Sequence, residues 1–353
     1  MKEKINIGVI GGSGYTGLEL VKILKNHKYS NISFLTSRTY KNKSVGEVFP
    51  SIQDDGENSL VFKETASKKD YEDIDLLYLC LPPHSSMEHI KNNISNKSLK
   101  IIDIGSDFRI NDPDSYKIWY GKDHIIPELL KDFTYGLPEI NRDIIKKSLY
   151  IANPGCYPTS VLLGLAPLLK TGLKPDHISI DSKSGVSGAG RKLAEPYLFG
   201  NLNNNFYAYS PETHRHIGEM EQEIKKISGQ DYKIDFTPHL LPVNRGIFSS
   251  IYCKVTGDLP DDFKESIIKN YNDFYKNSIF VKILTEGMPQ LKDVVGTNRC
   301  LIGIGYDKRT YTLKIFSAID NLLKGAAGQA VQNMNLMFGL KEYEGLLSDG
   351  VYS

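Results

Sequence analysis

The sequence predicts two domains of different kinds: an α/β domain with a doubly wound parallel sheet, followed by a mainly antiparallel α+β domain. In the first 150 residues, short continuous apolar runs alternate with helical patterns, which is typical of parallel strands covered on both faces. Beyond residue 150 the strands alternate apolar and polar residues, as in a sheet with one covered face. A length of 353 residues suits two domains, each with its own core.

The first domain begins with a strand over 5–10, which leads through a glycine-rich loop into a helix over 16–26. Further apolar strands follow over 31–36, 75–81 and 100–104, and the last two each end in a loop. This alternation of strands and helices is the doubly wound pattern.

The second domain mixes helices with strands of period two. We place it at 156–321 as the catalytic and oligomerisation domain, and the first domain at 1–155, completed by a C-terminal segment 322–353 with an amphipathic helix. A polar, Asn-rich loop is expected over 201–209. The expected helices cover 159–170, 217–227, 261–276 and 325–338, and the strands 178–182, 247–255, 301–306 and 312–318.

Composition excludes several classes of function. Lys and Arg number 43 against 42 Asp and Glu, so no bulk positive charge favours nucleic acid. No apolar run approaches the roughly 18 residues that cross a bilayer, and the N-terminus enters a strand without a targeting segment. Four cysteines without a CxxC pair argue against a disulfide scaffold or a zinc finger. We expect a cytoplasmic protein that binds neither nucleic acid nor membrane.

The glycine-rich loop predicts a dinucleotide site. Gly11, Gly14 and Gly17 stand three residues apart, between the first strand and the first helix. Without side chains the backbone can turn tightly and approach a pyrophosphate, whose charge then lies at the helix N-terminus. The alternative is a tight strand–helix connection without a ligand, but this position in the chain favours dinucleotide binding.

The end of the second strand predicts which dinucleotide is bound. An NAD site usually carries an acid there, which bonds the ribose 2′-hydroxyl. This chain instead has Thr36, Ser37 and Arg38, with Lys41 and Lys43 beyond. A hydroxyl and an arginine suit a 2′-phosphate through charge-assisted hydrogen bonds, so we predict NADP(H). The alternative is that Arg38 is only a solvated loop charge.

Cys156 is the predicted nucleophile. It lies where a loop enters an apolar helix, with Pro158 suited to the first turn. A helix N-terminus favours the thiolate, which is the reactive form of the side chain. Cys80, Cys253 and Cys300 lie in apolar strand contexts, where a cysteine is usually a small buried hydrophobic residue.

A nucleophilic cysteine beside a nicotinamide indicates reduction of an acyl group through a thioester, or the reverse reaction. Such a step needs a proton donor and acceptor. Among eight histidines, His214 and His216 stand out, followed by Glu219 in a segment that leads into a helix. The alternative for this pair is a metal site, but no third ligand is evident nearby apart from His239.

Three further loops carry polar groups. Arg109 follows a strand of the parallel sheet and could clamp a carboxylate or a phosphate. The glycine- and serine-rich segment 184–191 can wrap a ligand with backbone amides, although a flexible hinge is the alternative. Asn321 lies where the second domain returns to the final helix, and there it could touch the cofactor.

On these residues, the chain resembles the N-acetyl-γ-glutamyl-phosphate reductases of arginine biosynthesis. The resemblance implies a Rossmann domain that binds NADPH, a catalytic domain of the semialdehyde dehydrogenase and glyceraldehyde-3-phosphate dehydrogenase type, and a homotetramer. One departure is the segment 81–86, where the family more often has a glycine after the histidine. The matching motifs follow one another along nearly the whole chain at 11–17, 107–109, 153–159, 184–191, 214–216 and 321–329.

The resemblance also implies individual roles. The family's nucleophile falls on Cys156, its acid/base histidine on His214 and its supporting acid on Glu219. Helical spacing alone would favour His216 as the partner of Glu219, but we follow the family pattern. Substrate contacts are expected at Arg109, Asn153, Ser184, Tyr209 and His216, and the resemblance also places Ser187 against the substrate. No metal is expected. Cofactor contacts are expected at Gly11, Ser13, Gly14, Tyr15, Thr16, Gly17, Ser37, Arg38, Pro82, Ser187, Gly188 and Asn321.

The predicted reaction is the NADPH-dependent reduction of N-acetyl-L-glutamyl 5-phosphate to the 5-semialdehyde. Aspartate-semialdehyde dehydrogenase shares the scaffold, but its cysteine motif lacks the Gly155-Cys156-Tyr157-Pro158 context. A lysine-pathway paralogue acting on the aminoadipate homologue is harder to separate, because one methylene changes binding by only about 1–3 kcal/mol. An NADP-sensing regulatory protein would not need Cys156 and His214 together.

Overall fold

The computed structural model divides the chain into two compact units, each formed from two stretches of sequence. Unit 1 comprises Met1–Pro154 and Ala326–Leu347, and unit 2 comprises Gly155–Gly325 and Ser348–Ser353. The doubly wound parallel sheet and the α+β sheet expected from the sequence are both confirmed, one in each unit. The structure describes residues 4–53, 59–96, 98–255 and 259–350.

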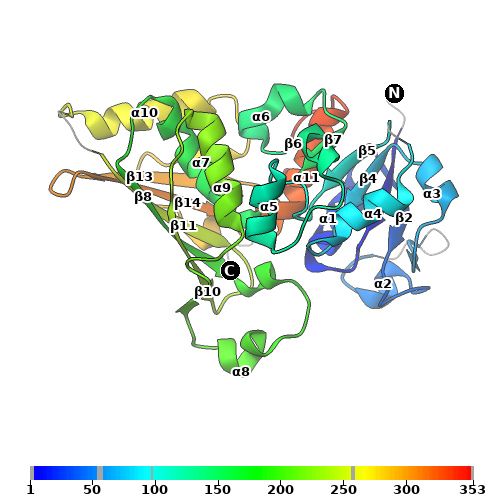
Figure 1. Ribbon diagram of the computed structural model, residues 1–353. Coiled ribbons are helices and arrows are strands. Elements are labelled where there is room, and N and C mark those ends of the chain that lie inside the picture. Colours follow the sequence, from blue (N-terminus) through cyan, green and yellow to red (C-terminus); the bar gives the residue numbers. More distant parts are fainter. Residues whose placement is uncertain (1–3, 54–58, 97, 256–258, 351–353) are drawn as a thin grey trace. The chain divides into compact units, whose positions relative to one another are not determined.

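Unit 1 is built on a seven-stranded sheet in the order β3-β2-β1-β4-β5-β7-β6, with every neighbouring pair parallel (Figure 1). Its strands are β1 Ile5–Ile10, β2 Ser30–Thr36, β3 Phe62–Lys63, β4 Leu76–Leu79, β5 Lys100–Asp103, β6 Phe133–Tyr135 and β7 Tyr150–Ala152. Its helices are α1 Tyr15–Asn26, α2 Val45–Val48, α3 Lys68–Glu72, α4 Ser85–Asn93, α5 Pro113–Tyr120, α6 Pro138–Ile145 and α11 Gly328–Met337.

The central strands form because their residues are apolar on both sides of the chain. All four residues of β4 are buried, as continuous hydrophobic strands in a covered parallel sheet must be. Helix α11 packs against α1 and α6 and is buried along its whole length. The amphipathic expectation for this helix is wrong, because hydrogen bonds rather than water satisfy its polar side chains. Gln332 donates to Glu139, and Asn335 lies 3.0 Å from the His27 ring nitrogen Nε2.

Unit 2 is built on a second seven-stranded sheet in the order β12-β13-β14-β11-β8-β10-β9. It is mainly antiparallel, with β10 parallel to β8 and β12 parallel to β13. Helix α7 packs on β11 and β14, and α9 and α10 pack against α7 (Figure 1). The elements are α7 Cys156–Lys170, β8 His177–Gly185, α8 Phe199–Leu202, β9 Tyr207–Ala208, α9 His216–Ser228, β10 Asp235–Leu241, β11 Ile247–Lys254, α10 Phe263–Tyr275, β12 Val281–Ile283, β13 Cys300–Asp307 and β14 Thr312–Ile319.

The Asn-rich segment 201–209 is not a simple loop. It overlaps the short helix α8, and it contains strand β9, which pairs with β10. The amide of Leu202 donates to Leu198, and the side chain of Asn205 donates to the carbonyl of Asn201. Local hydrogen bonds made by polar side chains therefore give the segment a defined course.

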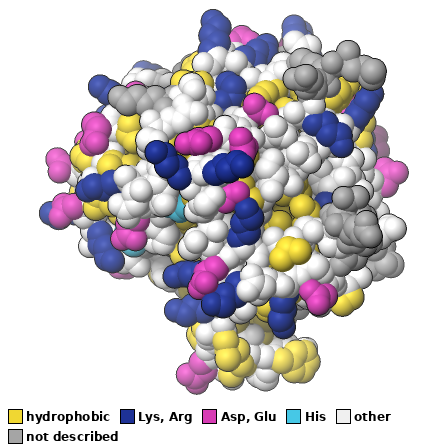
Figure 2. Space-filling view, turned by 90° about the vertical axis from the view of Figure 1, so that its right-hand side faces the viewer, with side chains coloured by type: hydrophobic (Ala, Val, Ile, Leu, Met, Phe, Trp, Pro, Cys, Tyr) yellow, Lys and Arg dark blue, Asp and Glu magenta, His cyan; other side chains and the backbone are white. Residues whose placement is uncertain are grey.

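Charge is spread rather than concentrated on the face drawn in Figure 2, where Lys and Arg side chains alternate with Asp and Glu. Such mixing accords with the near balance of 43 cations and 42 anions. Across the described ranges, no helix is long and apolar enough to span a membrane, and no cluster of three potential metal ligands occurs.

Candidate functional site

The glycine loop of unit 1 joins β1 to α1, as predicted. Gly11 has a φ of 84°, and a Cβ there would lie 2.4 Å from the carbonyl oxygen of Cys80. A Cβ on Gly17 would lie 2.5 Å from the carbonyl oxygen of Gly11. Both positions therefore require glycine. Gly14 is the N-cap of α1, and because no side chain caps this turn, its amides suit a phosphate.

A cavity of about 510 Å³ opens beside this loop within unit 1. The hydroxyl of Ser13 lies 2.8 Å from that of Ser37, and Gly11 donates its amide to Thr36 Oγ1, so the loop is tied to the end of β2. The lining includes the predicted cofactor contacts Gly11, Ser13, Gly14, Ser37, Arg38 and Pro82. Its size and its polar groups fit the adenosine and phosphate portions of a dinucleotide.

The position of Cys80 differs from the sequence interpretation. It follows the last residue of β4, is partly exposed as a residue, and lines the cavity beside Leu81. Removal of the thiol from water, together with the nearby charge of Asp103, raises the pKa of Cys80 to about 12. Cys80 is therefore a weakly reactive thiol in the cavity wall. Cys253 and Cys300 lie in buried strand positions, as predicted.

Arg109 and Asn153 are both buried in unit 1, and their polar groups contact protein atoms. Arg109 donates from Nε to the carbonyl of Asn153 and from Nη2 to the carbonyl of Ile104. The side chain of Asn153 donates to the carbonyl of Ala326 and accepts from Asn333. These contacts order the segment before Cys156, whereas substrate binding by either residue stays a prediction.

A buried carboxyl group, Asp103, ends strand β5 near the same loops. It accepts hydrogen bonds from the hydroxyl of Ser86 and the amide of Gly105 through Oδ1. Burial, followed by the charge of nearby Asp107, raises the pKa of Asp103 to about 7. An Asp in an unfolded chain titrates near 3.9.

This difference predicts a pH dependence of stability. Between about pH 4 and pH 7 the native state binds a proton that the unfolded state has lost, so stability falls as pH rises through that window. Asp103→Asn keeps an acceptor oxygen but cannot ionise, so we expect a flatter profile. Urea unfolding from pH 4 to 8 measures this, and equal slopes for both proteins would contradict it.

The candidate nucleophile lies in unit 2, at the first residue of helix α7. Cys156 is partly exposed, whereas the next thirteen residues of the helix are buried. Gly155, the N-cap, donates its amide over 2.8 Å to Oε1 of Glu219, which is fully buried in the first turn of α9. Glu219, the predicted supporting acid, thus fixes the backbone at Gly155, the residue directly before Cys156.

His214 lies before α9 and is enclosed by aromatic rings. Its ring centroid is 5.6 Å from that of Tyr157, 5.7 Å from Tyr209 and 4.8 Å from His216. Burial, and then the charge of Arg215, lowers the pKa of His214 to about 4. Its Nδ1 accepts the backbone amide of His216, so the proton of the neutral ring lies on Nε2.

Two tyrosine hydroxyl groups meet beside this histidine. The hydroxyl oxygens of Tyr157 and Tyr209 are 3.0 Å apart, and Tyr157 also donates to the carbonyl of His239. Burial raises the pKa of both phenols, so they are neutral hydrogen-bonding groups. Tyr209 was predicted as a substrate contact. Tyr157 was given no role, although its place directly after Cys156 was a usable signal.

Ser184, Ser187 and Gly188 lie at the end of β8 and in the turn after it. Ser187 accepts a hydrogen bond from the side chain of Asn321, and a Cβ on Gly188 would lie 3.1 Å from the hydroxyl of Ser184. Unit 2 thus brings these predicted residues together. Gly325, which the sequence did not single out, packs on the nucleophile, since a Cβ there would lie 2.9 Å from Cβ of Cys156.

Solved structures establish the fold by comparison. Aspartate semialdehyde dehydrogenase II from Vibrio cholerae, complexed with ASA, gives a TM-score of 0.71 at 16% identity, covering 96% of this chain and 99% of that one. Aspartate semialdehyde dehydrogenase with NADP from Candida albicans gives 0.70 at 14% identity, covering 95% and 99%.

Sequence comparison establishes the family. The family model described as semialdehyde dehydrogenase, NAD binding domain, matches residues 6–148. The model described as semialdehyde dehydrogenase, dimerisation domain, matches residues 156–321. N-acetyl-gamma-glutamyl-phosphate reductase from Pelotomaculum thermopropionicum is 46% identical over 99% of both chains. The protein of that name from Alkaliphilus metalliredigens is 47% identical over 97% of this chain and 98% of its own. The chain therefore belongs to the N-acetyl-gamma-glutamyl-phosphate reductase family and is an oxidoreductase with a nicotinamide cofactor.

Proposed function

We propose that the protein reduces N-acetyl-L-glutamyl 5-phosphate with NADPH, giving N-acetyl-L-glutamate 5-semialdehyde and phosphate in cytoplasmic arginine biosynthesis. The main support for this proposal is the position of Cys156 at the start of α7, in the same unit as the enclosed imidazole of His214. A thiol at a helix start and a neutral imidazole with its proton on Nε2 suit nucleophilic attack and hydrogen bonding to the oxygen that becomes negatively charged in the reaction.

The chemistry follows from these two residues. The thiolate of Cys156 attacks the acyl carbon, the bond to phosphate breaks, and a thioester forms. NADPH, when bound, supplies a hydride to that carbon. The Nε2–H group of His214 donates a hydrogen bond to the negatively charged oxygen that results, and this oxyanion collapses to the aldehyde as the carbon–sulfur bond breaks. The aldehyde leaves and the thiolate is restored.

The assay must distinguish the glutamyl substrate from its aminoadipate homologue, because the two differ by only one methylene. We expect phosphate-dependent NADP reduction with N-acetyl-L-glutamate 5-semialdehyde to exceed that with the longer homologue by at least about tenfold in kcat/KM, within the range one methylene can supply. A preference for the longer compound would indicate the lysine-pathway activity. Dinucleotide binding without turnover of either would indicate a sensor.

We propose NADPH over NADH on the strength of Arg38. This side chain is exposed at the cavity and makes no hydrogen bond or ion pair with the described residues, so its guanidinium can meet a 2′-phosphate. Hydrogen bonds to charged groups contribute about 1.5–3 kcal/mol. Arg38→Ala should therefore lower kcat/KM for NADPH by about 10- to 100-fold and leave that for NADH nearly unchanged.

Lys41→Ala is the matched control, because Lys41 is an exposed cation nearby that is already paired with Glu64 at 3.2 Å. It should change kcat/KM for NADPH by less than about threefold, in keeping with the small contribution of exposed pairs. Equal kcat/KM for NADH and NADPH in the unmutated enzyme would refute the cofactor assignment.

We also propose a homotetramer. The segment before β9 exposes large apolar side chains, with Leu193 at 82% and Phe199 at 79% of their full exposure, as is common where protein surfaces associate. Closed symmetry is the rule for soluble oligomers. Light scattering at micromolar concentration should give four times the 39.7 kDa of one chain. A monomeric mass would contradict the proposal.

A further inference from the structure

A π-helical turn, Leu323–Ala327, follows strand β14 and reaches the nucleophile. The carbonyl oxygen of Asp320 accepts the amide of Gly325 over 2.9 Å. A Cβ on Gly325 would lie 2.9 Å from Cβ and 3.3 Å from Cα of Cys156. This contact lies wholly within unit 2, and the position of the turn therefore sets the space beside the thiol.

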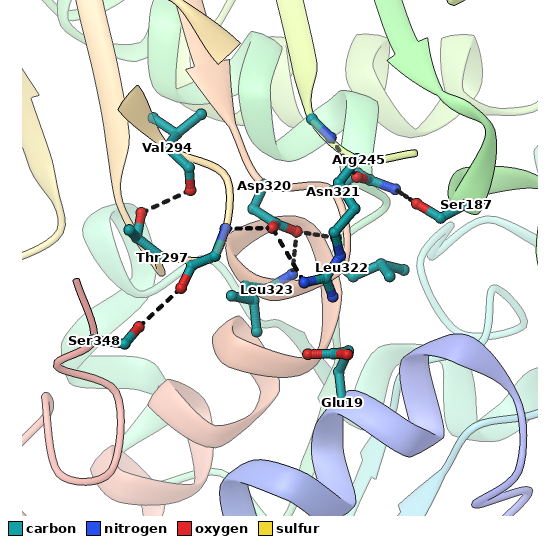
Figure 3. Close-up of polar contacts among 12 residues, drawn as sticks. Glu19, Ser187, Arg245, Val294, Thr297, Asp320, Asn321, Leu322, Leu323 and Ser348 are labelled. Carbon is teal, nitrogen blue, oxygen red and sulfur yellow. Dashed lines mark hydrogen bonds and ion pairs between the residues drawn. The ribbon is translucent and has the colours of Figure 1, made fainter. Parts of the chain in front are cut away.

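The carboxylate of Asp320 holds this turn in place. It is fully buried, and Oδ1 accepts the amides of Leu322 over 2.8 Å and Leu323 over 3.1 Å. Oδ2 accepts the amide of Gly296 over 2.9 Å and lies 3.6 Å from Nη1 of Arg245 (Figure 3). A buried carboxylate among three amides and a guanidinium makes charge-assisted bonds, which are stronger and shorter than neutral ones.

The neighbouring side chain points to a different partner. Asn321 accepts the amide of Gly246 over 2.7 Å and donates to the hydroxyl of Ser187 over 2.9 Å (Figure 3). The two consecutive side chains thus have separate tasks: Asn321 fixes the Ser187 turn, whereas Asp320 fixes the turn that carries Gly325. Lys324 adds a further anchor, since its ammonium lies 5.9 Å from the ring centroid of Phe280.

We propose that Asp320 is a positioning residue for the nucleophile: by closing the π-helical turn, it presses Gly325 against Cys156 and fixes the thiol in its attacking position. Asp320 does not touch the thiol and acts only through Gly325. The proposal deepens the assigned reaction and rests on Cys156 as its nucleophile.

The test is a double-mutant cycle. Asp320→Asn preserves size but puts an NH₂ group opposite either the Leu322 and Leu323 amides or the Gly296 amide, so one set of hydrogen bonds is lost in either orientation. Gly325→Ala leaves the carboxylate intact and places a methyl group against Cys156. A misplacement near 1 Å can cost about 10²-fold in rate, so each single variant should lower kcat by about 10- to 100-fold with KM for NADPH changed less than about twofold.

Because Asp320 acts through Gly325, the double variant should lose no more kcat than the worse single variant. Iodoacetamide labelling of Cys156 in the cofactor-free enzyme should also change by more than about threefold in both single variants, with labelling of Cys80 as the internal reference. This readout needs no substrate, so it tests positioning even if the assigned substrate is wrong.

Asp107→Asn is the matched control, because Asp107 is equally buried and accepts three backbone amides, those of His84, Ser86 and Met87, in unit 1. It should cost comparable thermal stability without altering the labelling rate of Cys156. Additive losses in the double variant, or kcat within twofold of wild type in Asp320→Asn, would overturn the proposal. If Asp320→Asn fails to fold, Gly325→Ala is sufficient as a test. A normal kcat together with a normal labelling rate of Cys156 in that variant would overturn the proposal.

Discussion

Cys156→Ser should abolish turnover while leaving NADPH binding nearly intact. A serine hydroxyl is a poor nucleophile at neutral pH, whereas the cofactor cavity is lined by other residues, all in unit 1. Steady-state assays and a fluorescence titration with NADPH measure the two properties separately. Cys253→Ala is the control, because Cys253 is buried in β11 and should be replaceable without loss of turnover. Residual activity above about one per cent in Cys156→Ser would refute the assignment.

Alkylation gives an independent measurement of the same property. Burial raises the pKa of the Cys253 thiol to about 12, as it does that of Cys80, so both carry little thiolate at pH 8. Iodoacetamide should therefore label Cys156 first, and activity should disappear with that label. Peptide mass spectrometry identifies the labelled site. Labelling of another cysteine first, with activity retained, would be the contrary result.

His214→Asn should lower kcat by at least about 10²-fold, the usual cost of losing a general acid–base group or a hydrogen-bond donor to the reacting oxygen. His216→Asn is the matched variant, and it should act mainly on KM if that residue only helps to hold substrate. Their rings are 4.8 Å apart, so both variants disturb the same aromatic cluster and differ in which imidazole is lost. If His216→Asn damages kcat more, the two roles must be exchanged.

The pH profile adds a second test of His214. Its pKa of about 4 keeps the imidazole neutral at physiological pH, and the ring becomes charged only as pH falls towards that value. The profile of kcat should then show no inflection from this residue between pH 5 and 8. Since an unfolded histidine titrates near 6.5, the His214 contribution to stability should be complete above that pH and be lost as pH falls to about 4.

Some parts of the fold were predictable from the sequence because they follow from local patterns. The strand over 76–79 is a continuous apolar run, and Cys156 was predictable as a helix start because a loop motif precedes a long apolar stretch. Strand β10, Asp235–Leu241, was missed because its Pro and His interrupt the apolar pattern. The three-residue strands β6 and β7 are too short to show a period.

The contacts that build the site were less predictable, because they join residues far apart in the chain. Gly325 reaches Cys156, and Glu219 reaches Gly155, through packing that no local spacing encodes. The burial of polar side chains was also not predictable from the sequence. Asn333 lies inside unit 1, where it donates to the carbonyl of Gly136 and to Oδ1 of Asn153, and helical periodicity alone would place such a residue towards solvent.

Helix α11 has a consequence for synthesis on the ribosome. It supplies the hydrogen-bond partners of Asn153, Gly136 and His27. It begins at Gly328, however, more than 170 residues after the end of β7, the last strand of the unit 1 sheet. A nascent chain that has emerged only through residue 154 therefore lacks one helix of its own unit. Unit 1 therefore cannot acquire its last helix before residues 155–325 of unit 2 have been synthesised, because α11 follows them in the chain. A stop codon just before residue 328 would thus remove the helix that packs on α1 and α6, together with its hydrogen bonds to Asn153, Gly136 and His27.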